Sequence, residues 1–362
     1  MKKFREGFLQ SLVILWLILI LSACQEPTAV LLEPLPTGKP AEKPQDLGQI
    51  GVYFSEAGSP TADSYRGGAD EVLAGAIDQA RFRVDLAVYD LDLWSVRDAL
   101  LRAHQRGVTV RVVVESDRAE EAEIQALRSA GIPVVGDQRR GLMHQKFVII
   151  DQRDVWTGSM NFTLRGVYRN DNHLLHFRSP SLAENYTVEF EEMFEDQLFG
   201  DRIRDNTTHP KLEIQGGLVE TYFSPDDHPQ KRIIELIQGA EDQIKFLAYS
   251  FTSDPIAQAM IRCSERGVLV QGVIDTSQLY SEMGSEWERF KKNGVDVRKD
   301  GNPEKMHHKF ILIDGEIVIM GSYNFTESAE KVNDENVLII HNAALADIFH
   351  REFQRVYRKG HP

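Results

Sequence analysis

The chain has 362 residues, enough for two domains of ordinary size. Its 55 acidic residues exceed its 41 basic residues and give a net charge of −14, which disfavours binding of nucleic acid unless a local basic groove is present. With only two cysteines, Cys24 and Cys263, no disulfide framework is expected.

Residues 1–24 have the composition of an export signal. A basic start precedes an apolar core at residues 12–21, which is too short to span a bilayer comfortably. The sequence Leu-Ser-Ala-Cys at residues 21–24 resembles a bacterial lipobox, in which the cysteine is diacylated and becomes the mature N-terminus. We therefore predict a lipoprotein signal peptide at 1–24 and lipidation of Cys24, with a simple secretory signal as the alternative.

Lipid on Cys24 predicts a location at the bacterial cell envelope. Gln25 is not the aspartate that signals inner-membrane retention, so we expect the outer membrane in a Gram-negative organism and otherwise the outer face of the cytoplasmic membrane. Residues 25–48 contain five prolines without sustained periodicity and are predicted to form an extended tether. Without residues 1–24 the net charge is −16, because three basic residues and one acidic residue are removed.

From residue 49 onward, patterns typical of strands and helices alternate. The first half predicts helices near 68–80, 95–106, 119–130 and 181–197, and strands at 84–89, 108–114, 132–135 and 173–177. The second half repeats this order, because residues 244–249 resemble 84–89 and residues 265–268 resemble 105–108. Such alternation favours an α/β fold in which each half is a mixed β-sheet flanked by helices.

The predicted domain boundaries follow from this repeat. We expect a first half at 49–205, a linker at 206–217, where Asn, Thr, Pro and Gly cluster, and a second half at 218–362. The two halves are expected to pack as a pseudo-twofold dimer with one shared active site, because each half holds only half of the chemistry.

One motif occurs twice in register, once in each half. Both copies read H-x-K-x4-D-x6-G-S-x-N, and they are 163 residues apart (307 minus 144). Six fixed residues repeated at the same spacing are not expected by chance. The first copy is His144, Lys146, Asp151, Gly158, Ser159 and Asn161, and the second is His307, Lys309, Asp314, Gly321, Ser322 and Asn324.

The residue types of this motif suit an anionic phosphate. Side chains two apart in a strand share a face, so each histidine is expected to point the same way as its lysine. A hairpin about the turn that follows each aspartate would bring the histidine opposite the asparagine. Lysine and asparagine would then hold phosphate oxygens while histidine attacks or transfers protons. Ser159 and Ser322 would either assist the site or cap the turn.

The two motifs resemble the signature of the phospholipase D superfamily, and the paired copies cover nearly all of the chain after residue 50. The resemblance implies two α/β halves whose motifs meet in one site, a phosphohistidine intermediate and no metal cofactor. It also implies that Asp151 and Asp314 are structural supports. A metal site at His307 and His308 is a rival interpretation, but lysines beside both motif histidines would repel a divalent cation, and His308 points to the opposite face.

The two copies differ at the position expected to support a histidine. In the family, an acidic residue after G-S-x-N orients a catalytic histidine through its second ring nitrogen. Glu335 follows the second copy, whereas the aligned residue after the first copy is Asn172, preceded by Asp171. A carboxylate raises the basicity of an imidazole, while an amide only orients it. We predict that His307, supported by Glu335, is the nucleophile and that His144 is the general acid and base, with Asp171 serving His144 as the alternative.

The predicted reaction is displacement at a phosphodiester, carried out on phospholipid head groups at a membrane surface by a functional monomer without a cofactor. With glycerol or phosphatidylglycerol as acceptor, the same site would be a phosphatidyltransferase, as in cardiolipin synthases. An envelope endonuclease of the same superfamily is one alternative. A non-catalytic envelope binding protein is another, against which the two intact motifs argue. Arg139 and Arg140 form a small basic spot that either faces the substrate or is only solvated.

Overall fold

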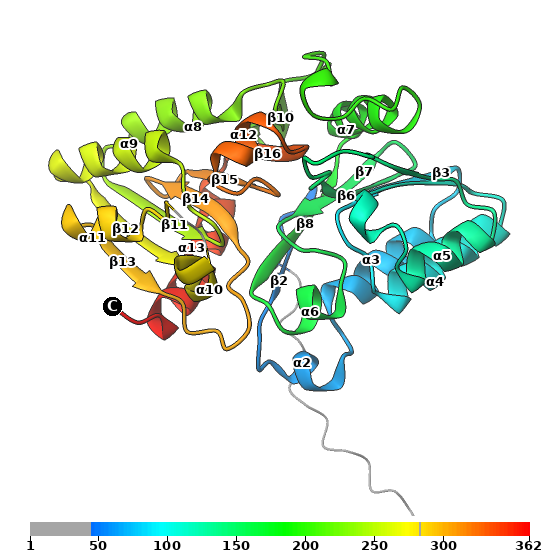
Figure 1. The fold of residues 1–362 in the computed structure, drawn as a ribbon, viewed down its shortest axis with the longest axis horizontal. Helices are drawn as coiled ribbons and strands as arrows, with labels where there is room; N and C mark the ends of the chain where they lie inside the picture. The colour runs from blue at the N-terminus through cyan, green and yellow to red at the C-terminus, as the bar shows by residue number, and fades with distance from the viewer. Residues whose placement is uncertain (1–44, 282–283) are drawn as a thin grey trace, which may run out of the picture. The chain divides into compact units, whose positions relative to one another are not determined.

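The computed structural model describes residues 45–281 and 284–362, shown as a ribbon in Figure 1. The predicted signal peptide, Cys24 and residues 25–44 of the predicted tether lie outside these ranges. Within them, no helix is both long and apolar enough to cross a membrane. Cys263 is a free, buried thiol in the helix Asp254–Glu265.

The first half forms an eight-stranded mixed sheet with the order β1-β2-β8-β7-β6-β3-β4-β5. The β3-β4 and β4-β5 pairs are parallel, and the other neighbours are antiparallel. Its strands are β1 (Gln45–Asp46), β2 (Ile50–Ser55), β3 (Arg83–Val88), β4 (Thr109–Val114), β5 (Val134–Gly136), β6 (Lys146–Ile150), β7 (Asp154–Gly158) and β8 (Asn172–Arg178).

The second half repeats this sheet strand for strand. Its order, β9-β10-β16-β15-β14-β11-β12-β13, matches the first sheet position by position, including the parallel pairs at one edge. Its strands are β9 (Lys211–Ile214), β10 (Gly217–Ser224), β11 (Gln243–Ala248), β12 (Leu269–Ile274), β13 (Asp296–Lys299), β14 (Lys309–Ile313), β15 (Ile317–Gly321) and β16 (Glu335–His341).

Helices cover the sheets in each half, and in Figure 1 α3, α4 and α5 lie together beside the first sheet. The helices of the first half are α2 (Pro60–Ser64), α3 (Ala69–Asp78), α4 (Trp94–Gln105), α5 (Ala122–Ser129), α6 (Leu164–Tyr168) and α7 (Pro180–Phe194), with 3-10 turns η1 (Ser116–Arg118) and η2 (Gly200–Arg202). Those of the second half are α8 (Pro229–Gln238), α9 (Asp254–Glu265), α10 (Thr276–Ser281), α11 (Trp287–Lys292), α12 (Glu327–Lys331) and α13 (Ala343–Lys359).

The predicted fold class is therefore confirmed, with two similar halves that each carry a mixed sheet and flanking helices. The predicted linker 206–217 is not entirely irregular, because β9 lies within it and pairs with β10 at the edge of the second sheet. The two short helices that follow the motifs, α6 and α12, were not predicted. They begin because Thr163 and Thr326 cap them, each side chain accepting a backbone N–H three residues later.

One buried hydrophobic cluster contains residues of both halves and joins them into a single body. It includes α7 and α13 together with the inner strands of both sheets, for example Phe147, Leu175, Tyr186, Phe310, Leu338 and Phe349. Each half has in addition its own outer core beneath its remaining helices. A core shared across the repeat holds the two motif strands at a fixed separation, which a shared active site requires.

The motif aspartates lie at the far ends of β6 and β14 from the histidines. Asp151 accepts hydrogen bonds from the backbone N–H groups of residues 81–83, at the start of β3. Asp314 accepts those of residues 241–243, at the start of β11. Both aspartates have positive φ, 53° and 52°. Each therefore ties its motif strand to the neighbouring strand and takes no direct part in the site.

We expect Asp314→Asn to lower the free energy of unfolding by about 1 to 2 kcal/mol, because hydrogen bonds to a charged acceptor contribute more than neutral ones. Burial alone would raise the pKa of Asp314, but the three backbone N–H donors lower it. The stabilisation is therefore present above the pKa of an unfolded aspartate and is lost as the pH falls through the lower folded pKa. Urea unfolding at pH 7 and pH 3 measures this. A deficit that is unchanged at pH 3 would contradict the role.

Candidate active site

The two halves exchange backbone hydrogen bonds beside their motifs. In the first half, His144 N–H donates to Asp334 C=O (3.0 Å), and Asp334 N–H donates to Leu142 C=O (2.9 Å). The same exchange occurs with the halves reversed, where His307 N–H donates to Asp171 C=O (2.8 Å) and Asp171 N–H to Lys305 C=O (2.9 Å). Each segment that carries a histidine thus pairs with the segment that enters β8 or β16 of the other half.

This exchange delivers each supporting side chain to the histidine of the opposite half. Glu335 Oε2 lies 2.7 Å from His144 Nδ1, whereas Asn172 Oδ1 lies 2.9 Å from His307 Nδ1. The prediction that Glu335 supports His307 is therefore wrong. Glu335 belongs to the second copy by sequence but serves the first copy in space.

Asp171 does not serve His144 either. Its carboxylate accepts from Arg355 (2.6 Å) and Asn302 (2.8 Å), both in the second half. Asp334, its equivalent, bonds Arg139 and accepts from Gly200 N–H (2.5 Å). These two carboxylates therefore link segments of the two halves to each other. Arg139 is consequently occupied by Asp334 and does not supply a substrate-facing charge.

A second pair of carboxylates supports the segments just before the histidines. Glu115, at the end of β4, accepts from Met143 N–H (2.8 Å), and Asp275, at the end of β12, accepts from Met306 N–H (2.9 Å). In each half, the backbone N–H groups of the motif histidine and of the methionine before it are both hydrogen-bonded. The backbone that carries the histidine is therefore held in place. Such rigidity favours reaction geometry that is set before the substrate arrives.

The motif histidines and lysines are almost completely buried, with 6% exposure for His144 and His307 and 1% for Lys146 and Lys309. Burial lowers the pKa of His144 to about 4 against the opposing effect of Glu335, and lowers the pKa of Lys146 to about 7. Burial and the neighbouring lysines also hold the pKa values of His307 and Lys309 well below their usual ranges. Both imidazoles are therefore neutral at pH 7 in the empty site.

Each lysine extends back beside its own histidine. Lys146 Nζ donates to the His144 carbonyl (2.7 Å), and Lys309 Nζ lies 3.1 Å from the His307 carbonyl and 3.2 Å from His307 Nε2. The predicted sharing of a face by histidine and lysine is thus seen in both halves.

Asn161 and Asn324 each have a buried Oδ1 atom without a hydrogen-bond partner among the described residues. Rotating the side-chain amide by half a turn exchanges the positions of its oxygen and its NH2 group. Each asparagine is therefore able to present its NH2 group to a phosphate oxygen. Unpaired buried polar atoms are uncommon in folded proteins and are expected where a ligand supplies the missing partner.

Ser159 and Ser322 hydrogen-bond to β8 and β16, the strands that carry the supporting residues Asn172 and Glu335. Ser159 Oγ donates to Asn172 Oδ1 (2.9 Å) and accepts from His173 N–H (3.1 Å), and Ser322 Oγ accepts from Asn336 N–H (3.0 Å). The serine hydroxyls therefore act on the site indirectly, whereas the backbone carbonyl of Ser159 lies 3.1 Å from His307 Nδ1.

Two tyrosines, one per half, form the walls of the site and were not identified from the motifs. The Tyr89 ring lies 5.1 Å from the His144 ring, and the Tyr249 ring lies 4.5 Å from the His307 ring. Lys146 and Lys309 approach the faces of the same tyrosines, at 5.4 and 4.9 Å from the ring centroids. Their signal in the sequence was that the predicted strands 84–89 and 244–249 both end in tyrosine.

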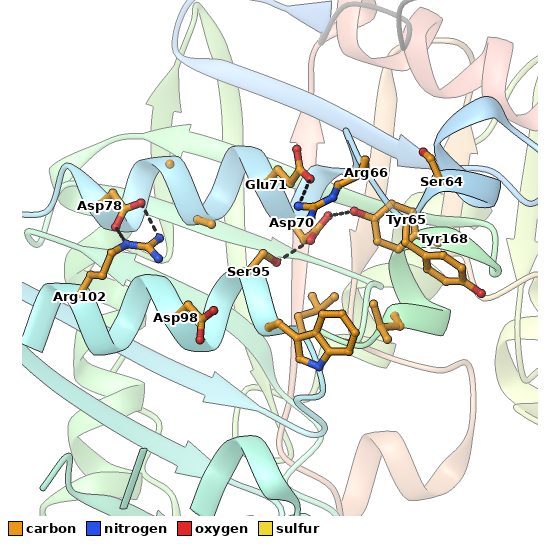
Figure 2. Close-up of a pocket in the computed structure, with 15 residues that line it drawn as sticks. Ser64, Tyr65, Arg66, Asp70, Glu71, Asp78, Ser95, Asp98, Arg102 and Tyr168 are labelled. Carbon is orange, nitrogen blue, oxygen red and sulfur yellow. Dashed lines mark hydrogen bonds and ion pairs between the residues drawn. The ribbon is translucent and has the colours of Figure 1, made fainter. Parts of the chain in front are cut away.

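A groove of about 650 Å³ lies between α3 and α4, and none of the motif residues lines it. Figure 2 shows that its polar groups bond one another: Arg102 pairs with Asp78 (2.8 Å), and Asp70 accepts from Ser95 (2.5 Å) and Tyr168 (2.7 Å). Since these groups already have partners, the groove has no free acid, base or nucleophile to offer.

Among residues 45–281 and 284–362, no three or more His, Cys, Asp and Glu side chains are grouped so as to hold a metal ion. The interpretation of His307 and His308 as metal ligands gains no support from this geometry. His308 is fully buried on the opposite side of its strand, where it contacts Glu352 (2.8 Å) and His173 (3.1 Å).

Comparisons with known proteins agree with this architecture. The family model described as "Cardiolipin synthase, PLD-like domain" matches residues 73–194 and 233–357, more than half of the chain. A mitochondrial cardiolipin hydrolase of Chlamydomonas reinhardtii is 27% identical over 168 residues, which is 40% of this chain and 75% of that protein. A phospholipase D of Rickettsia prowazekii (strain Madrid E) is 36% identical over 137 residues, which is 38% of this chain and 66% of that protein.

Among solved structures, the phosphatidylserine synthase of Haemophilus influenzae Rd KW20 superposes with a TM-score of 0.64 over 87% of each chain. The two sequences are only 14% identical, so this likeness establishes the fold alone.

The pKa values of His144 and Lys146 predict that kcat/KM for an anionic phosphodiester is constant between about pH 4 and about pH 7. As the pH rises through about 7, Lys146 loses its proton, and kcat/KM is expected to fall because the phosphate loses a charged partner. As the pH falls through about 4, His144 gains a proton and loses its free electron pair. Lys146→Arg should remove the alkaline limit, because arginine stays charged. An alkaline limit that is identical in this variant would show that another group sets it.

We expect Glu335→Gln to lower kcat about 100-fold or more, because the amide keeps the hydrogen bond to His144 but not the negative charge. The acid limit of the pH profile should also move to lower pH, since Glu335 raises the pKa of His144. Steady-state rates on a soluble phosphodiester measure both effects. Asn172→Ala, which removes the hydrogen bond to His307, should leave the acid limit within about 0.3 pH units of its original position.

Proposed function

The chain belongs to the phospholipase D superfamily and is a phospholipase D-like phosphodiesterase, and from this premise we propose that it cleaves phospholipid head groups through a phosphohistidine intermediate without a metal ion. The observation that carries the proposal is the unequal support of the two histidines at Nδ1, since Glu335 contacts Nδ1 of His144 while an amide oxygen and a backbone carbonyl contact Nδ1 of His307. This asymmetry suits a reaction in which one imidazole attacks phosphorus and the other transfers protons.

We assign the nucleophile to His144, which reverses the assignment made from the sequence. The earlier argument was that the histidine with a carboxylate is the more nucleophilic one, and that carboxylate belongs to His144. With its Nδ1–H donated to Glu335, His144 has its free electron pair on Nε2. Its low pKa, about 4, keeps this nitrogen unprotonated across the working pH range.

In the first step, His144 Nε2 forms a bond to phosphorus, and the bond from phosphorus to the leaving alcohol breaks. The protonated form of His307 gives its proton to the leaving oxygen, and the negative charge of the bound phosphodiester favours that form. In the second step, neutral His307 takes a proton from water or an acceptor alcohol, whose oxygen attacks phosphorus as the bond to His144 breaks. The two lysines and two asparagines would stabilise the phosphoryl oxygens throughout.

A lipid substrate fits the chain better than nucleic acid does. The net charge of −14 opposes binding to a polyanion, and the predicted lipidation of Cys24 would place the site at a membrane surface. We propose the cell envelope as its location. Because both motifs lie in one chain and meet in one site, a monomer would be sufficient for activity.

A phosphatidyltransferase is the second candidate, and the description of the matching family model favours it. Hydrolase and transferase would share the phosphohistidine intermediate and differ only in whether water or an alcohol takes the phosphatidyl group.

The test uses the full-length protein in neutral-detergent mixed micelles with phosphatidylglycerol, EDTA and ethanol, and it reads the lipid products by mass. We expect phosphatidic acid and phosphatidylethanol, both lost in His144→Ala and His307→Ala. A plasmid nicked under the same conditions while the lipid stays intact would favour the endonuclease. Activity that EDTA abolishes would contradict the metal-free mechanism.

The role assignment has its own test. Acid-stabilised trapping of a ³²P-labelled substrate, followed by peptide mapping, should place the label on His144. His307→Ala should still accumulate label with an activated leaving group such as p-nitrophenol, because that group needs no general acid. Label on His307 in the unmodified protein would restore the assignment made from the sequence.

A further inference from the structure

The two tyrosines beside the motif histidines have surroundings of different charge. On the second-half side, Lys305 is exposed, and its Nζ donates to Tyr249 OH (3.0 Å) at 5.2 Å from the ring centroid. Gln278 Nε2 donates to the same hydroxyl (2.9 Å). Lys305 forms no ion pair with a carboxylate among the described residues. The positive charge of Lys305 also helps to lower the pKa of His307, so it lies within electrostatic reach of that imidazole.

The first-half side also has a cation beside its tyrosine, but carboxylates lie close to it. Arg118 lies 5.6 Å from the Tyr89 ring centroid and pairs with Glu121 (3.2 Å). Glu121 in turn hydrogen-bonds Asp90, whose charge acts on Lys146. This side is therefore close to neutral or negative, whereas the Tyr249 side is positive.

The geometry of the proposed reaction determines which part of the substrate lies beside Tyr249 and which lies beside Tyr89. In displacement at phosphorus, the attacking and leaving atoms lie roughly in line on opposite sides. If His144 attacks and His307 protonates the leaving oxygen, the leaving alcohol must lie on the His307 side of the phosphorus. The remainder of that alcohol then extends past Tyr249 towards Lys305.

We propose that Lys305, together with Tyr249 and Gln278, forms the leaving-group subsite, and that this subsite selects phospholipids whose head group is anionic or a polyol over those with an ammonium head group. The proposal rests on the proposed function and its assignment of His307 as the general acid. A glycerol or a second phosphate would accept a hydrogen bond from the Lys305 ammonium, and Gln278 holds the Tyr249 hydroxyl beside it. Choline or ethanolamine would bring a second positive charge to an unneutralised lysine.

The same subsite selects the acceptor if the enzyme transfers phosphatidyl groups. The acceptor alcohol enters along the path by which the leaving alcohol departs, because the second step reverses the first with His307 as base. Glycerol should therefore compete successfully against choline or ethanolamine as acceptor.

The test compares two substitutions that each remove one positive charge, one beside Tyr249 and one beside Tyr89. Lys305→Gln acts on the proposed subsite, and Arg118→Gln copies into the first half the residue found at the equivalent position of the second, Gln278. The measurement is kcat/KM for phosphatidylglycerol and phosphatidylcholine with identical acyl chains, diluted in neutral-detergent micelles. We expect the ratio of the two to fall about five-fold or more in Lys305→Gln, further in Lys305→Glu, and less than about two-fold in Arg118→Gln.

The outcomes separate this proposal from the function on which it rests. A ratio that is unchanged in both Lys305 variants, or one that follows Arg118, would overturn the subsite while leaving the phospholipase activity established. Turnover of bis(p-nitrophenyl) phosphate without turnover of either lipid would overturn the proposed lipid function and the subsite with it. A mixture of glycerol and choline as acceptors gives a second readout, and the glycerol product should predominate in the unmodified protein and decline in Lys305→Glu.

Discussion

The active site depends on backbone pairing between halves that lie far apart in the sequence. Residues 142–144 bond to Asp334, and residues 305–307 bond to Asp171, through four N–H to carbonyl contacts. A change in register of either segment by one residue would turn the histidine or its support away from the site. The ion pairs of Asp334 with Arg139 and of Asp171 with Arg355 link the same segments of the two halves beside this pairing.

The site brings several ionisable side chains together in the protein interior, which costs stability that the rest of the fold must supply. Two lysines and two histidines lie together with little solvent, and burial lowers the pKa of all four. Glu335 is the carboxylate in direct contact with one of these histidines. Such an arrangement is unfavourable in the empty protein and becomes favourable when a phosphate supplies negative charge. The hydrophobic cluster shared by the two halves includes residues of both motif strands, and its burial offsets this cost.

The duplicated halves have diverged in the buried layer beneath the motifs. Below His307, His173 and His308 face each other with their Nδ1 atoms 3.1 Å apart, and His308 contacts Glu352. The equivalent layer of the other half contains amides, since Asn336 donates to Gln145 (2.7 Å), which donates to Glu189 (3.2 Å). The change from Glu335 to Asn172 is thus one of several differences that distinguish the surroundings of the two histidines. The two histidines therefore have different surroundings, which suits the two different roles that we propose for them.

The sequence alone determined the duplication, the mixed α/β class and the residue types of the motif, because these follow from local periodicity and from spacing within each copy. The hairpins that join β6 to β7 and β14 to β15, with their turns at Asp151 and Asp314, follow from neighbours close in the chain. Tertiary structure decided which support reaches which histidine. Glu335 lies 28 residues from His307 but 191 residues from His144, and only the pairing of the halves brings it to the latter. Likewise, Tyr89 and Tyr249 reach the motif histidines through the packing of strands within each half, a contact between residues more than 50 positions apart that the motif spacing does not reveal.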